Sequence, residues 1–258
     1  MESVVIKLGG SVITKKDEPL KERIETINNL SSQISSVCND LNLCIVHGGG
    51  SFGHYIAKKY AIHIGLPRIK IGLSILEMEM RRLNLIVAKS LINHGVPVIQ
   101  ISPIDIFSTK GDEINVFHSK PILDAINKGY IPLLYGDVVF DEEKGCRILS
   151  GDQICLELAK IISARKIVFC MDTMGIYDKD PKKHNDAKLI KKISKEEVKR
   201  LISNFSKGDD VTGGVVNKLL VAYEAANMGI KSIFINGFYH NMLMRVLRNE
   251  DYIGTEIY

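Results

Sequence analysis

The chain has 258 residues, of which 45% are hydrophobic and 25% charged, which suffices for one large folded domain or two small ones. A net charge of +4, spread over scattered Lys and Arg residues, argues against nucleic-acid binding. Five cysteines without a CxxC pair argue against a disulfide framework or a zinc site. No apolar run approaches the roughly 18 residues of a membrane span, and the N-terminus lacks a leader pattern, so we expect a cytoplasmic protein without a membrane partner.

Strand-like apolar runs alternate with amphipathic, helix-like segments along the chain. Up to residue 150 we predict, in order, a strand at 4–8, a helix at 23–41, a strand at 43–46, helices at 51–60 and 75–93, a strand at 98–101, a helix at 122–128, a strand at 131–135 and a hairpin of 138–141 with 146–149. Beyond it we predict a helix at 152–163, a strand at 166–170, helices at 196–204 and 215–228, a strand at 231–235, a helix at 241–248 and an edge strand at 255–258. This order predicts an α/β fold: a three-layer αβα sandwich with a mostly parallel central sheet.

A run of three glycines is the most informative local feature of the sequence. Gly48, Gly49 and Gly50 follow an apolar strand, and a turn without side chains lets backbone N–H groups converge on an anion. A helix that starts near Ser51 would add its positive N-terminal end. His54 lies about one helical turn beyond the glycines, so it would place a proton donor beside a phosphate-sized hole.

Two further glycine turns are each paired with a basic residue. Lys7 is the one charge in an apolar strand that runs into Gly9-Gly10, and a lysine there is costly to bury unless it meets an anion. The segment 210–214 (DVTGG) leads into a helix-like run that carries Lys218. Three such turns exceed what one phosphate needs, and they suit a phosphate donor together with a phosphate acceptor.

In their order and spacing these motifs resemble the amino acid kinase superfamily along nearly the whole chain. The motifs are KLGGS at 7–11, Gly48 to Gly50, Ser150-Gly151-Asp152, and 210–214 with Lys218; the segment 171–181 is similar to the family's nucleotide-site segment. Within the superfamily, KLGGSVITKK at 7–16 and HGGGSFGH at 47–54 most resemble the isopentenyl phosphate kinases. Met171 and Met174 stand where Thr and Asp are usual, which leaves the base and ribose contacts open.

The resemblance implies ATP-dependent phosphorylation of isopentenyl phosphate to isopentenyl diphosphate by direct in-line transfer, in the alternate mevalonate route of isoprenoid biosynthesis. It also implies Mg²⁺ with ATP, a homodimer, and a single domain, 1–258, with an acceptor-binding half (1–150) and a nucleotide-binding half (151–258). No carboxylate pair marks a metal site, so phosphates and water would hold the Mg²⁺. Because the acceptor phosphate has a second pKa of about 6, its attacking oxygen is already anionic and needs no general base.

Residue roles follow from the same resemblance. The catalytic residues would be Lys7, Lys16, His54 and Lys218. ATP would be bound by Lys7, Leu8, Gly9, Gly10, Ser11, Gly50, Asp172, Tyr177, Asp178, Gly213, Gly214 and Lys218. The acceptor would be bound by Gly49, His54, Gly151 and Asp152, with Asp152 orienting the lysines rather than abstracting a proton.

Several alternatives stay open at this point. Fosfomycin kinase shares a histidine at the position of His54, which carboxylate-phosphorylating members usually lack, so a fosfomycin-type phosphonate kinase is one rival. A non-catalytic member of the fold that binds an anion or a nucleotide is another. Asp172 and Asp178 are also typical turn formers. The stripe of Ile75, Leu76, Met78 and Met80 suits a slot for the acceptor's tail, but such a stripe is more often core.

Overall fold

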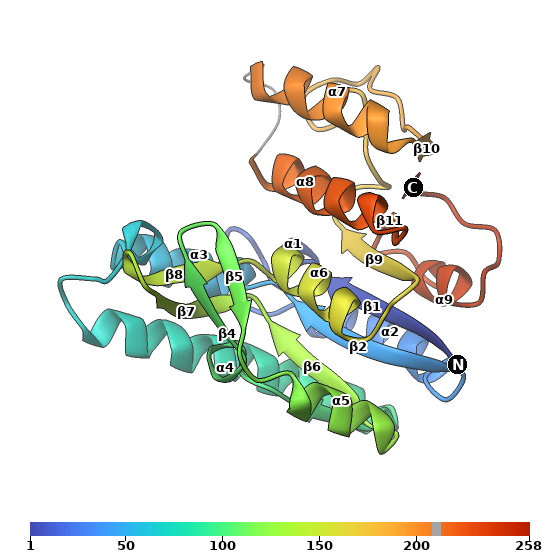
Figure 1. Cartoon of the computed structure of the whole chain (residues 1–258). Helices are drawn as coiled ribbons and strands as arrows, with labels where there is room; N and C mark the ends of the chain where they lie inside the picture. The colour runs from blue at the N-terminus through green and yellow to red at the C-terminus, as the bar shows by residue number, and fades with distance from the viewer. Residues whose placement is uncertain (208–212) are drawn as a thin grey trace.

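The computed structural model describes residues 1–207 and 213–258 (Figure 1). Its larger sheet has eight strands in the order β10-β12-β11-β9-β1-β2-β6-β3, and a smaller sheet has the order β5-β4-β7-β8. The larger sheet contains β1 (Glu2–Leu8), β2 (Leu41–His47), β3 (Val98–Gln100), β6 (Ile131–Tyr135), β9 (Lys166–Met171), β10 (Lys192–Ile193), β11 (Lys231–Asn236) and β12 (Thr255–Ile257). The smaller sheet contains β4 (Phe107–Lys110), β5 (Glu113–Val116), β7 (Asp137–Asp141) and β8 (Gly145–Leu149).

The larger sheet is mostly parallel, as the sequence predicts. Of its pairings in the described part of the chain, only β11 with β12 is antiparallel. Because β1, β2, β9 and β11 run in the same direction, their carboxyl ends meet at one edge of the sheet, where ligands of open α/β sheets bind. The turns that begin at Gly9, Gly48, Asp172 and Gly237 therefore lie side by side at this edge.

Helices cover both faces of this sheet. They are α1 (Gly10–Ile13), α2 (Ile24–Ser35), α3 (Gly50–Lys59), α4 (Ile71–Asn93), α5 (Lys120–Asn127), α6 (Gly151–Ile161), α7 (Lys195–Lys207), α8 (Gly213–Asn227) and α9 (Met242–Leu247), with short 3₁₀ turns at Ile62–Ile64 and Pro103–Asp105. Successive residues of β1 point to opposite faces. Val4 and Ile6 join a core built with α2, α3, α4 and α9, and Val5 joins a second core built with α5, α6 and α8. The predicted three-layer sandwich is thus confirmed.

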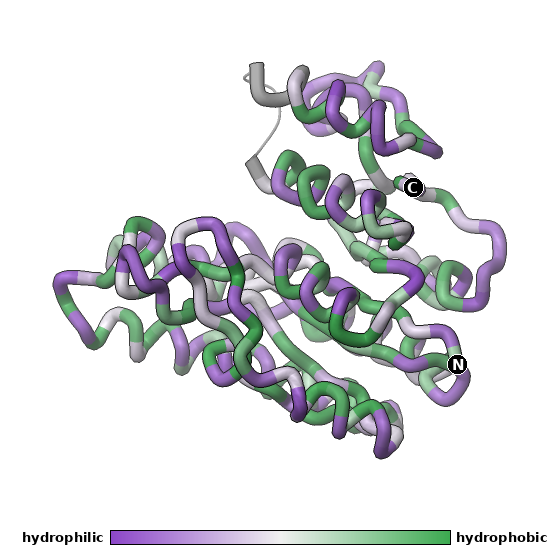
Figure 2. Tube along the Cα trace, viewed as in Figure 1, coloured by the Kyte–Doolittle hydropathy of each residue, from purple (hydrophilic) through white to green (hydrophobic). Residues whose placement is uncertain are grey.

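The outermost helix differs from those that touch the sheet. α7 packs against α8, and Figure 2 shows that α7 is largely hydrophilic whereas α8 is largely hydrophobic. The strands of the larger sheet are also mainly hydrophobic in this view. Among the described helices, none combines the length and the apolar character needed to cross a membrane.

The structure corrects several sequence predictions. The helix predicted at 23–41 ends at Ser35, and a turn over residues 36–40 leads into β2. The strand predicted at 255–258 is not at the edge, because β12 pairs with β11 on one side and with the two-residue β10 on the other. The β4–β5 hairpin and the four-residue helix α1 were not predicted. The predicted hairpin of 138–141 with 146–149 is present as β7 and β8.

Candidate active site

The glycine turns that follow β1 and β2 are in backbone contact. A Cβ atom added to Gly10 would lie 2.5 Å from the Gly50 nitrogen, and one added to Gly48 would lie 2.7 Å from the Gly10 nitrogen. Gly50 also has a φ of +48°, which side-chain-bearing residues rarely adopt. Glycine is therefore needed on both sides of this contact.

Thr14 connects the two turns through hydrogen bonds of its side chain. Its hydroxyl donates to the carbonyl of Gly10 at 2.7 Å and accepts from the Ser51 N–H at 3.0 Å. The side chain is fully buried, so no water competes for these bonds. The first turns of α1 and α3 begin at this contact, and the leading N–H groups of a helix have no partner within the helix. Backbone donors from both turns are thus gathered at one edge of the sheet.

A buried carboxylate joins two of the predicted catalytic lysines. Asp152, in the first turn of α6, accepts from Lys7 Nζ at 2.6 Å through one oxygen and from Lys218 Nζ at 3.2 Å through the other. The side chains of Lys7 and Asp152 are 6% and 9% exposed. Ser150 caps α6 through a capping box with Gln153, so Asp152 occupies the first turn rather than the N-cap. Residues separated by 145 and 66 positions in sequence are thereby brought together.

The charges of this trio depend on one another. Burial alone would raise the pKa of Asp152, but the charges of Lys7 and Lys218 and their hydrogen bonds lower it below its ordinary value. Burial lowers the pKa of Lys218, and the charge of Asp152 opposes that shift. Gly151 fits tightly against the group, since a Cβ there would lie 2.9 Å from Lys7 Cε. Two lysines and one carboxylate leave a net charge of +1, which suits a bound anion.

His54 lies at the rim of the same region. It is on α3, and its side chain is exposed. Neighbouring protein atoms lower the pKa of His54 through desolvation, and the positive charges of Lys218 and Lys7 lower it further. The imidazole therefore favours its neutral form, which can still donate one hydrogen bond. Gly49, one turn earlier, faces the sulfur of Met80: a Cβ there would lie 3.2 Å from Sδ.

Behind the loop, His47 has a structural role. It is fully buried, stacks on Tyr135 with ring centroids 5.5 Å apart, and contacts the Gly48 carbonyl through Nδ1 at 3.1 Å and Asn84 through Nε2 at 3.1 Å. Burial lowers the pKa of His47 to about 4, so the ring is neutral at pH 7. A neutral ring with its proton on Nδ1 donates to Gly48 and accepts from Asn84. Asn84 was not predicted, because it belongs to no motif in the sequence.

A second carboxylate with two lysines lies nearer to solvent. Asp172, directly after β9, contacts Lys182 Nζ at 2.6 Å and Lys16 Nζ at 3.2 Å, both through Oδ2. Burial would raise the pKa of Asp172, but the hydrogen bond from Lys182 and the charge of Lys16 lower it. Lys16 and Asp172 were predicted site residues, whereas Lys182 was not. The charge of Asp172 also acts on Lys218, which links the two carboxylates electrostatically.

The remaining predicted nucleotide-site residues are more scattered. Leu8 is buried, so its backbone alone can reach a ligand, and Ser11 is in the first turn of α1. Asp178 accepts a hydrogen bond from the Lys188 N–H at 2.8 Å, and Tyr177 forms an antiparallel β-bridge with Leu189. Both residues therefore help to close the loop between positions 177 and 189. Gly213 and Gly214 begin α8. The motif residues Asp210, Val211 and Thr212 lie outside the described residues.

Of the four residues in the predicted tail slot, Leu76 and Met80 are buried in the first core, and Ile75 packs partly buried against it. Met78 is 56% exposed. For Leu76 and Met80 the structure therefore agrees with the core interpretation. Met171, at the end of β9, is buried in the second core, and Met174 packs partly buried against the first.

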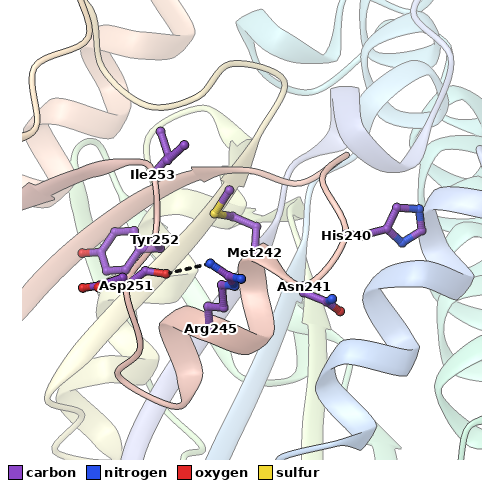
Figure 3. A pocket seen from close by; sticks show the side chains of 7 residues that line it. All are labelled: His240, Asn241, Met242, Arg245, Asp251, Tyr252 and Ile253. Atoms are coloured by element: carbon purple, nitrogen blue, oxygen red, sulfur yellow. Dashed lines mark hydrogen bonds between the residues drawn. The ribbon is translucent and has the colours of Figure 1, made fainter.

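The part of the chain that the structure describes holds no metal cluster that would point to the site. Within residues 1–207 and 213–258, no group of three or more His, Cys, Asp or Glu side chains could hold a metal ion. A cavity of about 340 Å³ beside α9 is lined by His240, Asn241, Met242, Arg245, Asp251, Tyr252 and Ile253 (Figure 3). It contains none of the predicted site residues. The convergence of lysines and glycine turns is what makes this region the candidate site.

Comparisons with known proteins identify the family of the chain. The model of the amino acid kinase family matches residues 2–236. Isopentenyl phosphate kinase of Thermoplasma acidophilum is 34% identical over 98% of this chain and 99% of its own, and that of Methanothermobacter thermautotrophicus is 31% identical over 98% of both chains. A crystal structure of isopentenyl phosphate kinase superposes over the full length of both chains with a TM-score of 0.87 at 28% identity. The chain therefore belongs to the amino acid kinase family, and within it the chain is similar in sequence and in fold to isopentenyl phosphate kinases.

Proposed function

We propose that the protein transfers the γ-phosphoryl group of ATP to isopentenyl phosphate, giving ADP and isopentenyl diphosphate. The observation that carries the proposal is the trio of Lys7, Asp152 and Lys218 beside two touching glycine turns, in a chain with isopentenyl phosphate kinases as full-length relatives. In the reaction an oxygen of the acceptor phosphate attacks the γ-phosphorus. The bond from the γ-phosphorus to the oxygen that bridges it to the β-phosphorus breaks, and ADP leaves with that oxygen.

Phosphoryl transfer depends on positioning and on charge neutralisation more than on covalent chemistry. Lys7 is buried against Gly151 and Asp152 at the end of β1, and it would bridge the donor and acceptor phosphates. Lys218 would hold the γ-phosphate and the leaving oxygen. Asp152 contacts both lysines, so it would fix their separation without taking up a proton. Its lowered pKa supports this role, because a carboxylate held by two ammonium groups is a poor base.

The other roles in this proposal follow the family resemblance. The N–H groups of Gly9, Gly10 and Ser11, with Gly50, would cradle the β- and γ-phosphates. His54 would donate a hydrogen bond to the acceptor phosphate, and the N–H groups of Gly49 and Gly151 would add to it. Lys16 would reach over the transferred group and stabilise its charge. Asp172, Tyr177, Asp178, Gly213 and Gly214 would border the nucleotide.

We also propose that Mg²⁺ enters the site together with ATP. The two central carboxylates, Asp152 and Asp172, each contact two lysines, so they do not fit a resident protein-held metal site. Mg²⁺ prefers phosphate and water oxygens in nucleotide sites. The acceptor half at 1–150, the nucleotide half at 151–258, the homodimer, the cytoplasmic location and the role in the alternate mevalonate route belong to the same proposal.

An assay of ADP release with purified protein, ATP and Mg²⁺ tests the function. Isopentenyl phosphate and fosfomycin would be compared as acceptors, with glutamate, carbamate and UMP as controls. We expect turnover with isopentenyl phosphate alone, since the relatives reported above favour that acceptor over fosfomycin. Turnover with fosfomycin alone would keep the phosphate chemistry and replace the substrate. Silence with every acceptor would favour a binding protein of the same fold.

A further inference from the structure

The carboxylate of Asp172 uses a single oxygen to hold two ammonium groups. Lys182 Nζ lies 2.6 Å from Oδ2 and Lys16 Nζ lies 3.2 Å from the same atom. Asp172 itself is more protected than either lysine: its side chain is 23% exposed, against 61% for Lys16 and 55% for Lys182. The two lysines therefore compete for one acceptor, and Lys182 makes the shorter contact.

This shared contact lies next to the glycine turn that follows β1, at Gly9 and Gly10. The carbonyl of Cys170, two residues before Asp172, accepts from the Gly9 N–H at 3.0 Å. Lys182 approaches from the loop that follows β9, where the side chain of Asp180 accepts its backbone N–H at 2.9 Å. Asp172 and Lys218 also interact electrostatically. Lys182 therefore lies on the loop after β9, at the border of the region where the proposed function places the phosphates.

We propose that Lys182 is a positioning residue: it keeps the charge of Asp172 compensated, so that Lys16 can leave this carboxylate and reach the transferred phosphoryl group. The proposal rests on the proposed function, because it takes Lys16 as the residue that stabilises the group in flight.

Lys16 and Lys182 compete for the same carboxylate oxygen of Asp172. An ammonium group that leaves a carboxylate must be replaced, or it leaves behind an uncompensated charge in a partly buried place. With Lys182 present, the departure of Lys16 leaves a close ion pair behind. Without Lys182, the departure of Lys16 would leave Asp172 with no counter-charge. The attraction between Asp172 and Lys16 would then oppose the movement of Lys16. Lys182 therefore lowers the barrier to moving Lys16.

A direct role of Lys182 on the nucleotide makes different predictions. A lysine that binds the phosphates itself would change the affinity for ATP, and it would do so whether or not Asp172 carries a charge. A lysine that acts through Asp172 would change kcat rather than the affinity for ATP. Its effect would also disappear once Asp172 is neutral. A double-mutant cycle separates these two cases.

The experiment compares Lys182→Met, Lys182→Arg, Asp172→Asn and the double variant K182M/D172N. Lys179→Met is the matched control, because Lys179 lies on the same loop and pairs with Asp186 at 2.5 Å instead of with Asp172. We expect Lys182→Met to lower kcat about three- to fivefold, the upper range for an exposed ion pair, with the ATP affinity within twofold of wild type. Lys182→Arg should retain the kcat of the parent protein. In the Asp172→Asn background, adding Lys182→Met should change kcat less than 1.5-fold, a factor within the error of additivity.

A second readout does not need turnover. Limited acetylation with acetic anhydride, followed by peptide mass spectrometry, reports how freely each lysine amine reacts. In Lys182→Met, Lys16 should react about threefold more slowly than in the parent protein, because Asp172 holds it more tightly. In the double variant this slowing should vanish. Thermal unfolding of every variant confirms that the fold is intact.

The outcomes are distinct. Slower labelling of Lys16 together with a lower kcat, both removed by Asp172→Asn, would support the proposal. An effect of Lys182→Met no larger than that of Lys179→Met would overturn it. So would a loss of ATP affinity that persists in the Asp172→Asn background, since Lys182 would then be a direct ligand. If the parent protein fails to turn over isopentenyl phosphate while labelling of Lys16 still depends on Lys182, the proposed function falls and the control of Lys16 by Lys182 stands.

Discussion

Two carboxylates of the candidate site each hold two lysines, Asp152 in a buried setting, which we call the floor, and Asp172 in a more exposed one, which we call the rim. On the floor, Asp152 holds Lys7 and Lys218 with one oxygen each, and the Lys7–Asp152 pair is almost fully buried. At the rim, Asp172 holds Lys16 and Lys182 with one shared oxygen, and both lysines are more than half exposed. Buried charges must stay paired, whereas exposed pairs contribute little and rearrange readily. The floor is thus suited to fixed geometry and the rim to movement.

The largest effect is expected on the floor. Asp152→Asn leaves the buried Lys7 and the partly buried Lys218 without a counter-charge, so we expect the free energy of unfolding to fall by about 3–5 kcal/mol and turnover to be lost. Urea unfolding at pH 7 measures the first quantity. A decrease in the free energy of unfolding of less than about 1 kcal/mol would mean that the floor tolerates unpaired charge. The contrast with the rim would then disappear.

At the rim, His54 should govern turnover and not stability. His54→Ala removes an exposed ring, so unfolding should change little, while kcat with isopentenyl phosphate should fall by about 10²–10³ because a donor to the acceptor phosphate is lost. Steady-state kinetics measure kcat, and calorimetry with ATP should show unchanged nucleotide binding. Unchanged turnover would remove His54 from the site.

The buried His47 makes the free energy of unfolding depend on pH. Because the pKa of His47 is about 4 in the folded chain and about 6.5 in the unfolded one, the unfolded chain takes up the proton first. Stability is therefore fully present above about pH 6.5 and is lost as the pH falls below it, by about 2 kcal/mol between pH 7 and pH 5. His47→Gln cannot take up this proton, so its stability should fall less over that interval. Parallel slopes of the two urea-unfolding series would contradict the assignment.

The smallest effect is expected for the rim carboxylate. Asp172→Asn removes two ion pairs whose lysines stay in contact with water, so the free energy of unfolding should change by about 1 kcal/mol or less. Thermal unfolding, compared at low and at high salt, measures this difference. A loss as large as that of Asp152→Asn would show that the rim is as rigid as the floor.

The sequence predicts the parts of the site that depend on local pattern. The glycine turns at 9–10 and 48–50 follow apolar strands, and parallel strands bring such turns to one edge, so this region was predictable. The contacts of Asp152 were less so, because they join side chains 145 and 66 residues apart. The contact of Lys182 with Asp172 gave no signal, since an exposed lysine in a charged loop has the pattern of a solvated surface.

The errors in the predicted fold have equally local causes. Apolar spacing continues through Val37 after α2 has ended, and the turn over residues 36–40 contains neither Gly nor Pro to mark the stop. The β4–β5 hairpin is short and turns at Gly111, where φ is +57°, so the signal existed but was not used. β10 has two residues, too few for any periodicity, and this is why β12 was predicted as the edge strand.

The contact between the two glycine turns limits how this enzyme could be redesigned. Because the backbones at Gly10, Gly48 and Gly50 already touch, main-chain atoms fix the separation of the glycine turns that follow β1 and β2. A substitution at any of these positions would disturb both turns at once. Under the proposed function, a change of acceptor would therefore come mainly through the side chains of α3 and α4 around the turn after β2, such as Met80, while the spacing of the two turns would stay the same.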